Sequence, residues 1–235
     1  MVGNDVVDIA ATRRRARNAR FDARVFSERE RRAIAADADG EARRWAHWAA
    51  KESAYKIAKR ADADTIFSPA KFAVAFDGGF DHGRDSDLSG SVRYGSTSYP
   101  VQVQRRGDCI HAVAVAPGGR PAARGPALRA VPLCGTYARF ARDLCLLRSI
   151  LAGVGPAPDG AGDTSASLAV RRLAIRDLAP RLATAASDLV VRSHERIPRL
   201  QHRDGHDVAT LSLSHHGRFV AYACRLPDAA AEAAR

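Results

Sequence analysis

The sequence predicts an α+β protein, a pseudo-dimer of two similar α+β halves that each carry a small antiparallel sheet and a packed helix. One observation is an uninterrupted helical segment at residues 45–56, which contains neither Gly nor Pro. The other is a strand, Gly turn and strand pattern at 103–113 that recurs at 213–223. The expected divisions are a first half at 1–118, a Gly- and Pro-rich linker at 119–132, a second half at 133–228 and a frayed tail at 229–235.

The first half is expected to open with a short strand at 2–9, led by a Gly turn. Its further elements are a basic helix at 10–24, a helix that starts after Ser27, the helix at 45–56, and strands at 71–76, 91–94 and 99–116, with a Gly- and Asp-rich loop at 77–90. Ser27 is the predicted N-cap of its helix, because Glu30 stands three residues later and completes a capping box.

The second half is expected to alternate helices and strands in a similar way. Its elements are a helix at 137–151, a loop at 153–163, a helix at 168–182 that ends near Pro180, and strands at 188–194 and 208–226. The last strand is broken by a turn at His216 and Gly217, which makes it a hairpin.

The helix at 45–56 places a carboxylate among aromatic side chains. At 3.6 residues per turn, Glu52 shares one side with the two Trp residues and Tyr55. Lys51 and Lys56 flank it, although only four of the 37 basic residues of the chain are Lys. Lys is compact and its pKa shifts readily on burial, so this choice suggests that an ammonium group is needed here. A structural ion pair and a functional group both remain open from this segment alone.

Composition narrows the class of protein. The net charge of +11 and the pI of about 10.2 favour polyanionic partners such as nucleic acid, a phosphate-rich small molecule or an acidic protein. The chain has no apolar run long enough to cross a membrane and no signal-peptide pattern at its start. Its four Cys are widely spaced, which argues against a zinc site or a disulfide framework. We therefore expect a reduced, cytoplasmic protein.

Two acids occupy the first predicted strand. Asp5 and Asp8 are three residues apart, so in an extended strand their side chains point to opposite faces. At most one of them can face a given site directly. Solvated acids at the strand end are the alternative interpretation.

Four motifs together resemble the 4'-phosphopantetheinyl transferase superfamily. They are Gly-x-Asp at 3–5, Phe-Ser-x-x-Glu at 26–30, Trp-x-x-Lys-Glu-Ser-x-x-Lys at 48–56 and Ser-His at 214–215. Their order is that of the small trimeric holo-acyl-carrier-protein synthases. The length and the two halves are instead like the monomeric surfactin-synthetase type, in which the Ser-His half comes first. The resemblance thus implies a third arrangement, with the metal-binding half first, and a site that one chain can complete as a monomer.

The resemblance implies a transferase that moves the phosphopantetheine arm of coenzyme A to a Ser of an acyl or peptidyl carrier protein and releases adenosine 3',5'-bisphosphate. Asp5 and Glu52 would hold Mg²⁺, a hard cation that prefers carboxylate, phosphate and water oxygens. Glu52, directly or through a water, would be the general base, and Lys56 would stabilise the developing phosphate charge. The implied contacts to coenzyme A are Lys51, Ser214, His215 and, as a further candidate, His216.

The metal ligands implied by the resemblance are incomplete. Surfactin-type enzymes carry a second acid two residues after the Asp, where this chain has Val7. Asp8 matches the acid of the holo-synthase type but should face away from Asp5 in a regular strand. We therefore expect two protein ligands with water completing the shell, and Asp8 stays open as a third. For His215, an inconsequential turn histidine is the alternative.

The excess positive charge has an explanation under this resemblance, because carrier proteins are acidic around their acceptor Ser. The implied docking residues lie in the predicted basic helix and are Arg13, Arg14, Arg17, Arg20 and Arg24. Two rival functions remain. One is a basic nucleic-acid-binding module, which would need aromatic residues interleaved with the basic ones and a recognisable binding motif, and neither is evident. The other is a relative that binds the carrier or coenzyme A without catalysis.

Overall fold

The computed structural model describes residues 1–12, 19–80, 85–117, 165–194 and 197–225. The predicted linker at 119–132, helix at 137–151, loop at 153–163 and tail at 229–235 lie outside these residues. Among the described residues, no helix combines the length and the hydropathy needed to cross a bilayer.

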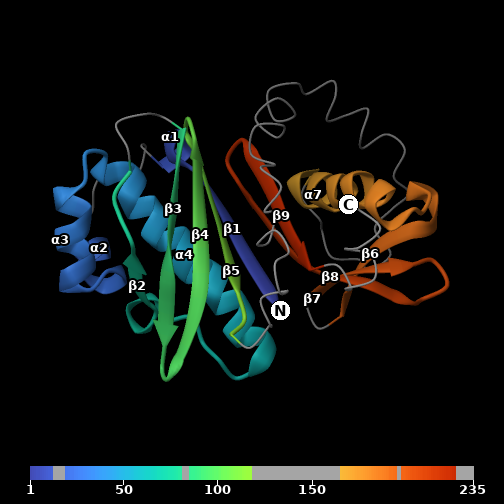
Figure 1. Cartoon of the computed structure of the whole chain (residues 1–235), viewed down its shortest axis with the longest axis horizontal. Helices are drawn as coiled ribbons and strands as arrows, with labels where there is room; N and C mark the ends of the chain where they lie inside the picture. Colours follow the sequence, from blue (N-terminus) through green and yellow to red (C-terminus); the bar gives the residue numbers. More distant parts are fainter. Residues whose placement is uncertain (13–18, 81–84, 118–164, 195–196, 226–235) are drawn as a thin grey trace.

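The first half is a five-stranded antiparallel sheet with helices on one face (Figure 1). Its elements are β1 (Val2–Asp8), α1 (Ile9–Thr12), α2 (Ala19–Val25), α3 (Glu28–Ala36), α4 (Gly40–Ala61), the short 3-10 helix η1 (Pro69–Lys71), β2 (Ala73–Phe76), β3 (Asp85–Tyr94), β4 (Thr97–Arg106) and β5 (Cys109–Val115). The strand order is β1-β5-β4-β3-β2. The N-cap at Ser27 and its capping box with Glu30 are confirmed, as is the helix at 45–56, which lies within α4.

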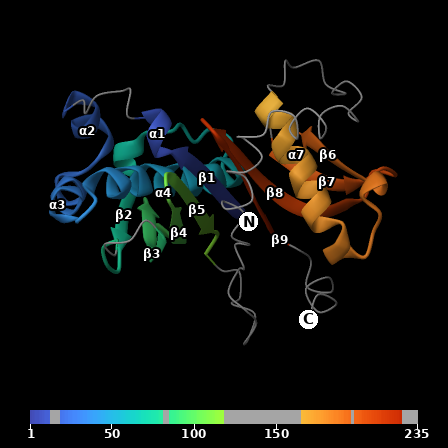
Figure 2. The same ribbon diagram turned by 90° about the horizontal axis from the view of Figure 1, so that it is seen from above.

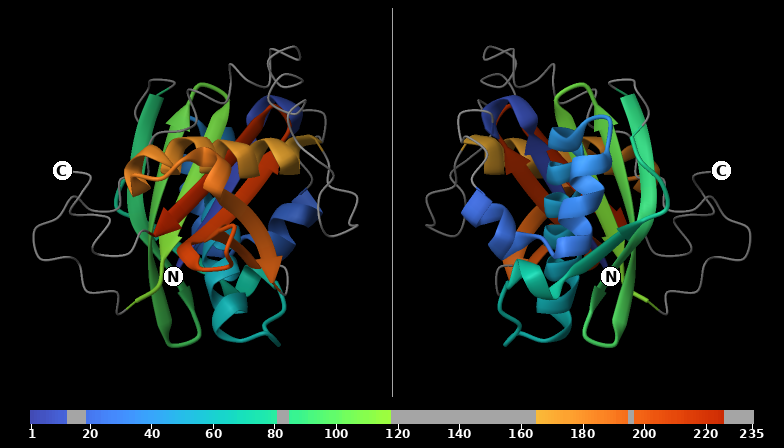
Figure 3. Two further views of the ribbon diagram at one scale, coloured as in Figure 1. Left: turned by 90° about the vertical axis from the view of Figure 1, so that its right-hand side faces the viewer. Right: turned by 90° about the vertical axis from the view of Figure 1, so that its left-hand side faces the viewer.

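The second half repeats this plan with four strands. Its elements are α7 (Ser165–Leu178), the 3-10 helices η2 (Pro180–Leu182) and η3 (Ala186–Asp188), β6 (Leu189–His194), β7 (Ile197–His202), β8 (Asp207–His216) and β9 (Phe219–Arg225). The order β6-β7-β8-β9 matches that of β2-β3-β4-β5, and in Figure 3 α7 lies across its sheet. Both hairpins that the repeated pattern predicted are present, β4–β5 and β8–β9. The α+β prediction is therefore confirmed, with two antiparallel sheets.

Strand β1 lies between the two halves, with α4 on one side and β8 and β9 on the other (Figure 2). It is the outer strand of its sheet, so one of its edges has no neighbouring strand. Side chains of β8 satisfy two N–H groups on that edge. The N–H of Asn4 donates to Ser212 Oγ at 2.9 Å, and the N–H of Asp8 donates to His216 Nδ1 at 2.9 Å.

Two basic side chains of α4 satisfy carbonyl groups on β1. Lys56 Nζ donates to the Asn4 carbonyl at 2.7 Å, and Arg60 Nη1 donates to the Val2 carbonyl at 2.8 Å. Arg60 Nη2 also donates to the Leu211 carbonyl of β8 at 2.6 Å. One guanidinium thus joins α4, β1 and the second half.

The buried side of α4 is its alanine side. Six Ala residues on it are at most 4% exposed, namely Ala42, Ala46, Ala49, Ala50, Ala54 and Ala58. The aromatic side, with Trp48 and Tyr55, is only partly buried, and Phe21 and Phe67 cover it. Small side chains allow the helix to approach the sheet closely, and this leaves Glu52 on the more open side.

Two strands differ from the sequence expectation. Residues 85–90, placed in a loop by their Gly and Asp content, begin β3, because Ser86 and Leu88 are buried while β4 supplies a full ladder. Strand β7 was not predicted, and it contains Pro198, a residue that is uncommon in strand interiors. Its pairing with β8 starts at Arg199, so the missing N–H of Pro198 leaves no gap in that ladder.

Candidate active site at the free edge of β1

The candidate site begins with Gly3, which lets β1 pack directly on α4. A Cβ atom built on Gly3 would lie 2.1 Å from the Ser53 carbonyl oxygen, so any side chain there would force the strand away. Ser53 Oγ in turn donates to the Ala112 carbonyl of β5 at 3.1 Å. Gly3 therefore lies inside the strand, where close approach requires it, and not in the turn that the sequence suggested.

This contact brings Asp5, Glu52 and Lys56 together. Lys56 Nζ lies 3.3 Å from Asp5 Oδ1, and both side chains are mostly shielded from solvent. Burial, and after it the charge of Asp5, raises the pKa of Glu52 to about 7, against the opposing effect of Lys56. Burial also raises the pKa of Asp5, which Lys56, His111 and His216 lower in part. The two carboxyl groups thus share one partly buried site in which both are costly to ionise.

Such a pair has two chemical uses. A carboxyl group whose pKa lies near 7 can take up a proton from a substrate at neutral pH. Two neighbouring carboxylates also suit a hard divalent cation, which would relieve their mutual repulsion. Among the described residues, no group of three or more His, Cys, Asp or Glu side chains is arranged to hold a metal ion. Asp5 and Glu52 are the two carboxylates of this site that could hold such an ion.

Lys51 lies away from this pair, although it precedes Glu52 in the chain. Its side chain is fully buried, and Nζ donates to Glu30 Oε2 at 2.9 Å and to the carbonyls of Pro69 at 3.1 Å and Phe72 at 2.6 Å. Burial lowers the pKa of Lys51, and the Glu30 carboxylate opposes that effect. All three N–H groups are used, so this placement does not suit a phosphate contact. The buried ion pair of Lys51 and Glu30 instead joins the motif at 48–56 to the motif at 26–30.

The Ser-His segment on β8 is divided between two faces. Ser214 is buried and accepts from Asn4 Nδ2 at 3.3 Å, so it faces the first half. His215 is exposed and follows Leu213 onto the other face, where Leu213 packs with the α7 core. His216 returns to the side of Ser214 and accepts the Asp8 N–H. Of the two histidines, His216 lies close enough to Asp5 for its charge to affect the pKa of that carboxyl.

Asp8 is directed away from Asp5, as the strand alternation predicted. Its carboxylate is 1% exposed and forms a bidentate ion pair with Arg218, with distances of 2.7 and 2.8 Å. Although burial opposes it, hydrogen bonding from Arg218 holds the pKa of Asp8 below its usual value. In this position Asp8 is a partner of the second half and not a neighbour of the acid pair.

Sequence reasoning missed several residues of the site. Asn4, the variable position of Gly-x-Asp, is fully buried, and its Nδ2 lies 3.2 Å from His111 Nε2. A buried amide between two histidine-bearing strands leaves no periodic signal. Arg218 could have been found, because it occupies the position in the β8–β9 turn that Asp108 occupies in the β4–β5 turn.

The predicted docking residues are only partly described. Arg20 and Arg24 are exposed on α2, while Arg13, Arg14 and Arg17 lie outside the described residues.

Comparison with known proteins agrees with this site. Residues 1–114 match the family model described as the 4'-phosphopantetheinyl transferase superfamily, and no curated protein matches the chain. The match includes the Gly-x-Asp strand and the whole of α4, which hold Asp5, Glu52 and Lys56. This region of the chain, 114 of its 235 residues, is therefore similar to that superfamily.

Proposed function

We propose that this protein transfers the 4'-phosphopantetheine arm of coenzyme A to a Ser hydroxyl of an acyl or peptidyl carrier protein, with Mg²⁺, and releases adenosine 3',5'-bisphosphate. The observation that carries the proposal is the placement of Glu52, with its pKa raised to about 7, beside Asp5 and Lys56. The match of residues 1–114 to the superfamily model supports the class of reaction.

The residues of the site suit each demand of this reaction. Glu52 accepts the proton of the attacking Ser hydroxyl, directly or through a water, as a base whose pKa is close to the working pH. Lys56 uses two of its N–H groups on Asn4 and Asp5, so one remains to donate to a phosphate oxygen. His216 Nε2 has no hydrogen bond to any described residue, and His216 lies on the same side of β8 as Ser214. The His216 ring and the Ser214 hydroxyl are therefore both placed to contact the phosphates of coenzyme A.

Magnesium fits the donors present. Asp5 and Glu52 offer only carboxylate oxygens, which are hard ligands, and burial raises the pKa of both, so a bound cation would favour their ionised forms. When bound, Mg²⁺ supplies positive charge to the pyrophosphate of coenzyme A. Lys51 is not part of the proposed coenzyme A site, because its ammonium is already bound to Glu30. Asp8 is not part of the proposed metal site, because its carboxylate is already bound to Arg218.

The excess of basic residues fits the same partners. Coenzyme A carries phosphates, and exposed Arg20 and Arg24 on α2 offer positive charge to an acidic carrier protein. We infer a cytoplasmic enzyme that works as a monomer, because both halves contribute to one site.

The experiment that tests the proposal measures the intact mass of an apo carrier protein after incubation with coenzyme A and Mg²⁺. We expect the wild type to add one phosphopantetheine arm, and Glu52→Gln to reduce the initial rate by roughly 10²–10⁴-fold. Glu28→Gln is the matched control, since Glu28 is exposed on α3 and the change is chemically the same. Omission of Mg²⁺ should also stop the transfer.

The outcome also separates the rival functions. Coenzyme A binding without mass gain on either acyl or peptidyl carriers would indicate a relative that only binds. Salt-dependent retention on DNA without coenzyme A binding would indicate a nucleic-acid-binding module.

A further inference from the structure

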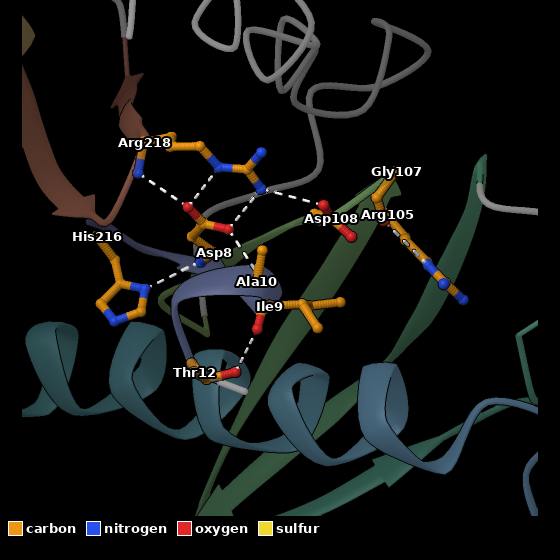
Figure 4. A network of polar contacts seen from close by, with 9 residues as sticks. All are labelled: Asp8, Ile9, Ala10, Thr12, Arg105, Gly107, Asp108, His216 and Arg218. Atoms are coloured by element: carbon orange, nitrogen blue, oxygen red, sulfur yellow. Dashed lines mark hydrogen bonds and ion pairs between the residues drawn. The ribbon is translucent and has the colours of Figure 1, made fainter. Parts of the chain in front are cut away.

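One connection between the two halves is a cluster of polar contacts around the Asp8 carboxylate (Figure 4). Arg218, in the β8–β9 turn, donates to it through Nε at 2.8 Å, Nη2 at 2.7 Å and its backbone N–H at 2.9 Å. Arg218 Nη2 also donates to Asp108 Oδ2, in the β4–β5 turn, at 3.1 Å. The backbone N–H of Ala10 also donates to the Asp8 carboxylate, at 3.1 Å. We call Asp8, Arg218 and Asp108 the inter-half clasp.

The turn that carries Arg218 packs closely against Asp8. Gly217 has a φ of 55°, and a Cβ built there would lie 2.5 Å from Asp8 Oδ2. Only glycine allows the turn to approach this closely. Because the Asp8 carboxylate is also 1% exposed, it is enclosed by the second half.

The same turn carries His216 on its other side. The N–H of Asp8 donates to His216 Nδ1 at 2.9 Å, so the hydrogen of the neutral ring is on Nε2. In Figure 4 the second ring nitrogen is directed away from Asp8, on the side of α4. One residue, Asp8, therefore holds the β8–β9 turn by its side chain and orients a histidine of that turn by its backbone.

We propose that Asp8 and Arg218 are positioning residues that hold the β8–β9 turn against β1 and thereby present His216 Nε2–H to the phosphates of the substrate. This rests on the proposed function for the identity of the phosphates. It assigns Asp8 a role other than metal binding, and it assigns the phosphate contact to His216 and not to the exposed His215. A bidentate guanidinium–carboxylate pair suits this role, because two parallel hydrogen bonds fix orientation as well as distance.

The test removes the clasp and follows His216 directly. In Arg218→Gln the buried Asp8 carboxylate loses its two hydrogen bonds from the guanidinium, while Arg218→Lys keeps the charge without the bidentate geometry. Arg176→Gln is the matched control, because it removes one positive charge from an exposed ion pair in the second half.

The first readout is the ¹⁵N spectrum of the histidine rings at neutral pH, with His216→Gln used to assign the signal. We expect the wild type to show His216 as the Nε2–H tautomer and Arg218→Gln to show a mixture of tautomers, while Arg176→Gln stays like the wild type. The measurement needs no substrate. An unchanged His216 signal in a folded Arg218→Gln protein overturns the proposal.

The second readout is the affinity for coenzyme A by calorimetry, with the kinetic constants of transfer. We expect Arg218→Gln to weaken binding and raise KM about tenfold with kcat within about threefold, and Arg218→Lys to lie between it and the wild type. Arg176→Gln should bind within about twofold of the wild type. If the wild type binds coenzyme A and Arg218→Gln binds it equally well, the positioning role is overturned. If the wild type does not bind it, the proposed function fails, and the ¹⁵N spectra alone decide whether the clasp orients His216.

Discussion

Glu52 and Lys51 are adjacent in the chain, but α4 directs their side chains to different surroundings. The Lys51 ammonium is held by Glu30 of α3 and by carbonyl groups in and directly after η1. Glu52 stands beside another carboxyl and gains no comparable partner, so its ionisation opposes folding. Each difference leads to a measurable consequence for stability.

The raised pKa of Glu52 makes the stability of the protein depend on pH. Its pKa rises from 4.5 to about 7 on folding, so between these values the folded state binds more protons than the unfolded state. The free energy of unfolding therefore falls as the pH rises through this window. In metal-free buffer we expect Glu52→Gln to be more stable than the wild type at pH 8, by on the order of 2 kcal/mol, and nearly equal to it at pH 4.5. Urea unfolding at both pH values checks this, and a variant less stable than the wild type at pH 8 contradicts it.

The buried pair of Lys51 and Glu30 predicts a purely structural effect. Lys51→Met leaves the Glu30 carboxylate buried without its ammonium partner, and we expect it to cost about 3–5 kcal/mol in urea unfolding. Lys59→Met on the exposed side of the same helix should change stability by less than about 0.5 kcal/mol. A folded Lys51→Met protein of normal stability with weakened coenzyme A binding would instead support the phosphate contact that the family resemblance implied.

Sequence reasoning located the main residues of the site but not all their directions. The spacing within the Lys-Glu motif was enough to place Glu52 and Lys56 on one side of a helix, and the strand period correctly separated Asp5 from Asp8. The surroundings of Lys51 could not be read from the same motif, because its partners are the cap of α3 and two carbonyls from distant segments. Tertiary contacts determine which polar side chains already have hydrogen-bond partners within the fold.

At the scale of elements, the packing of β1 on α4 determines whether the two acids meet. The aromatic side of α4 is the more conspicuous one in the sequence. The alanine side is nevertheless the one that packs on the sheet, because small side chains allow the backbones to approach closely. Gly3 belongs to the same contact on the strand side. An alternating or periodic pattern does not reveal such a contact, because glycine and alanine carry little periodic signal.

The close approach of β1 to α4 predicts that Gly3→Ala is strongly disruptive. Its methyl group would meet the Ser53 carbonyl oxygen and Ile57 Cγ1, and the carbonyl cannot move without disturbing α4. We expect a loss of about 3 kcal/mol in thermal or chemical unfolding, as for an overpacked core. Gly78→Ala, whose new methyl group has no neighbour within 4 Å, is the control and should be nearly neutral. Equal stability of the two variants would show that β1 can shift at little cost.

At the scale of the whole molecule, the repeated hairpin pattern correctly indicated two related halves, and the strand orders bear this out. What the pattern could not supply was the interface. Side chains of β8 and α4 satisfy the free edge of β1, and a single guanidinium, that of Arg60, spans three elements. The contacts from α4 to β1 join residues 52 and 58 positions apart, and those that involve β8 join residues 151 and 208 positions apart, so none of them has a local signature.

The inter-half clasp also has a consequence for how such a chain can originate. Asp108 and Arg218 occupy corresponding turn positions of the two halves and meet each other. In a symmetric dimer of identical subunits, corresponding residues that meet at the twofold axis are necessarily the same, so an acid there can face only an acid. Joining the two copies in one chain removes that constraint. An acid of one half can then face a base of the other, and attraction replaces repulsion where the two turns meet.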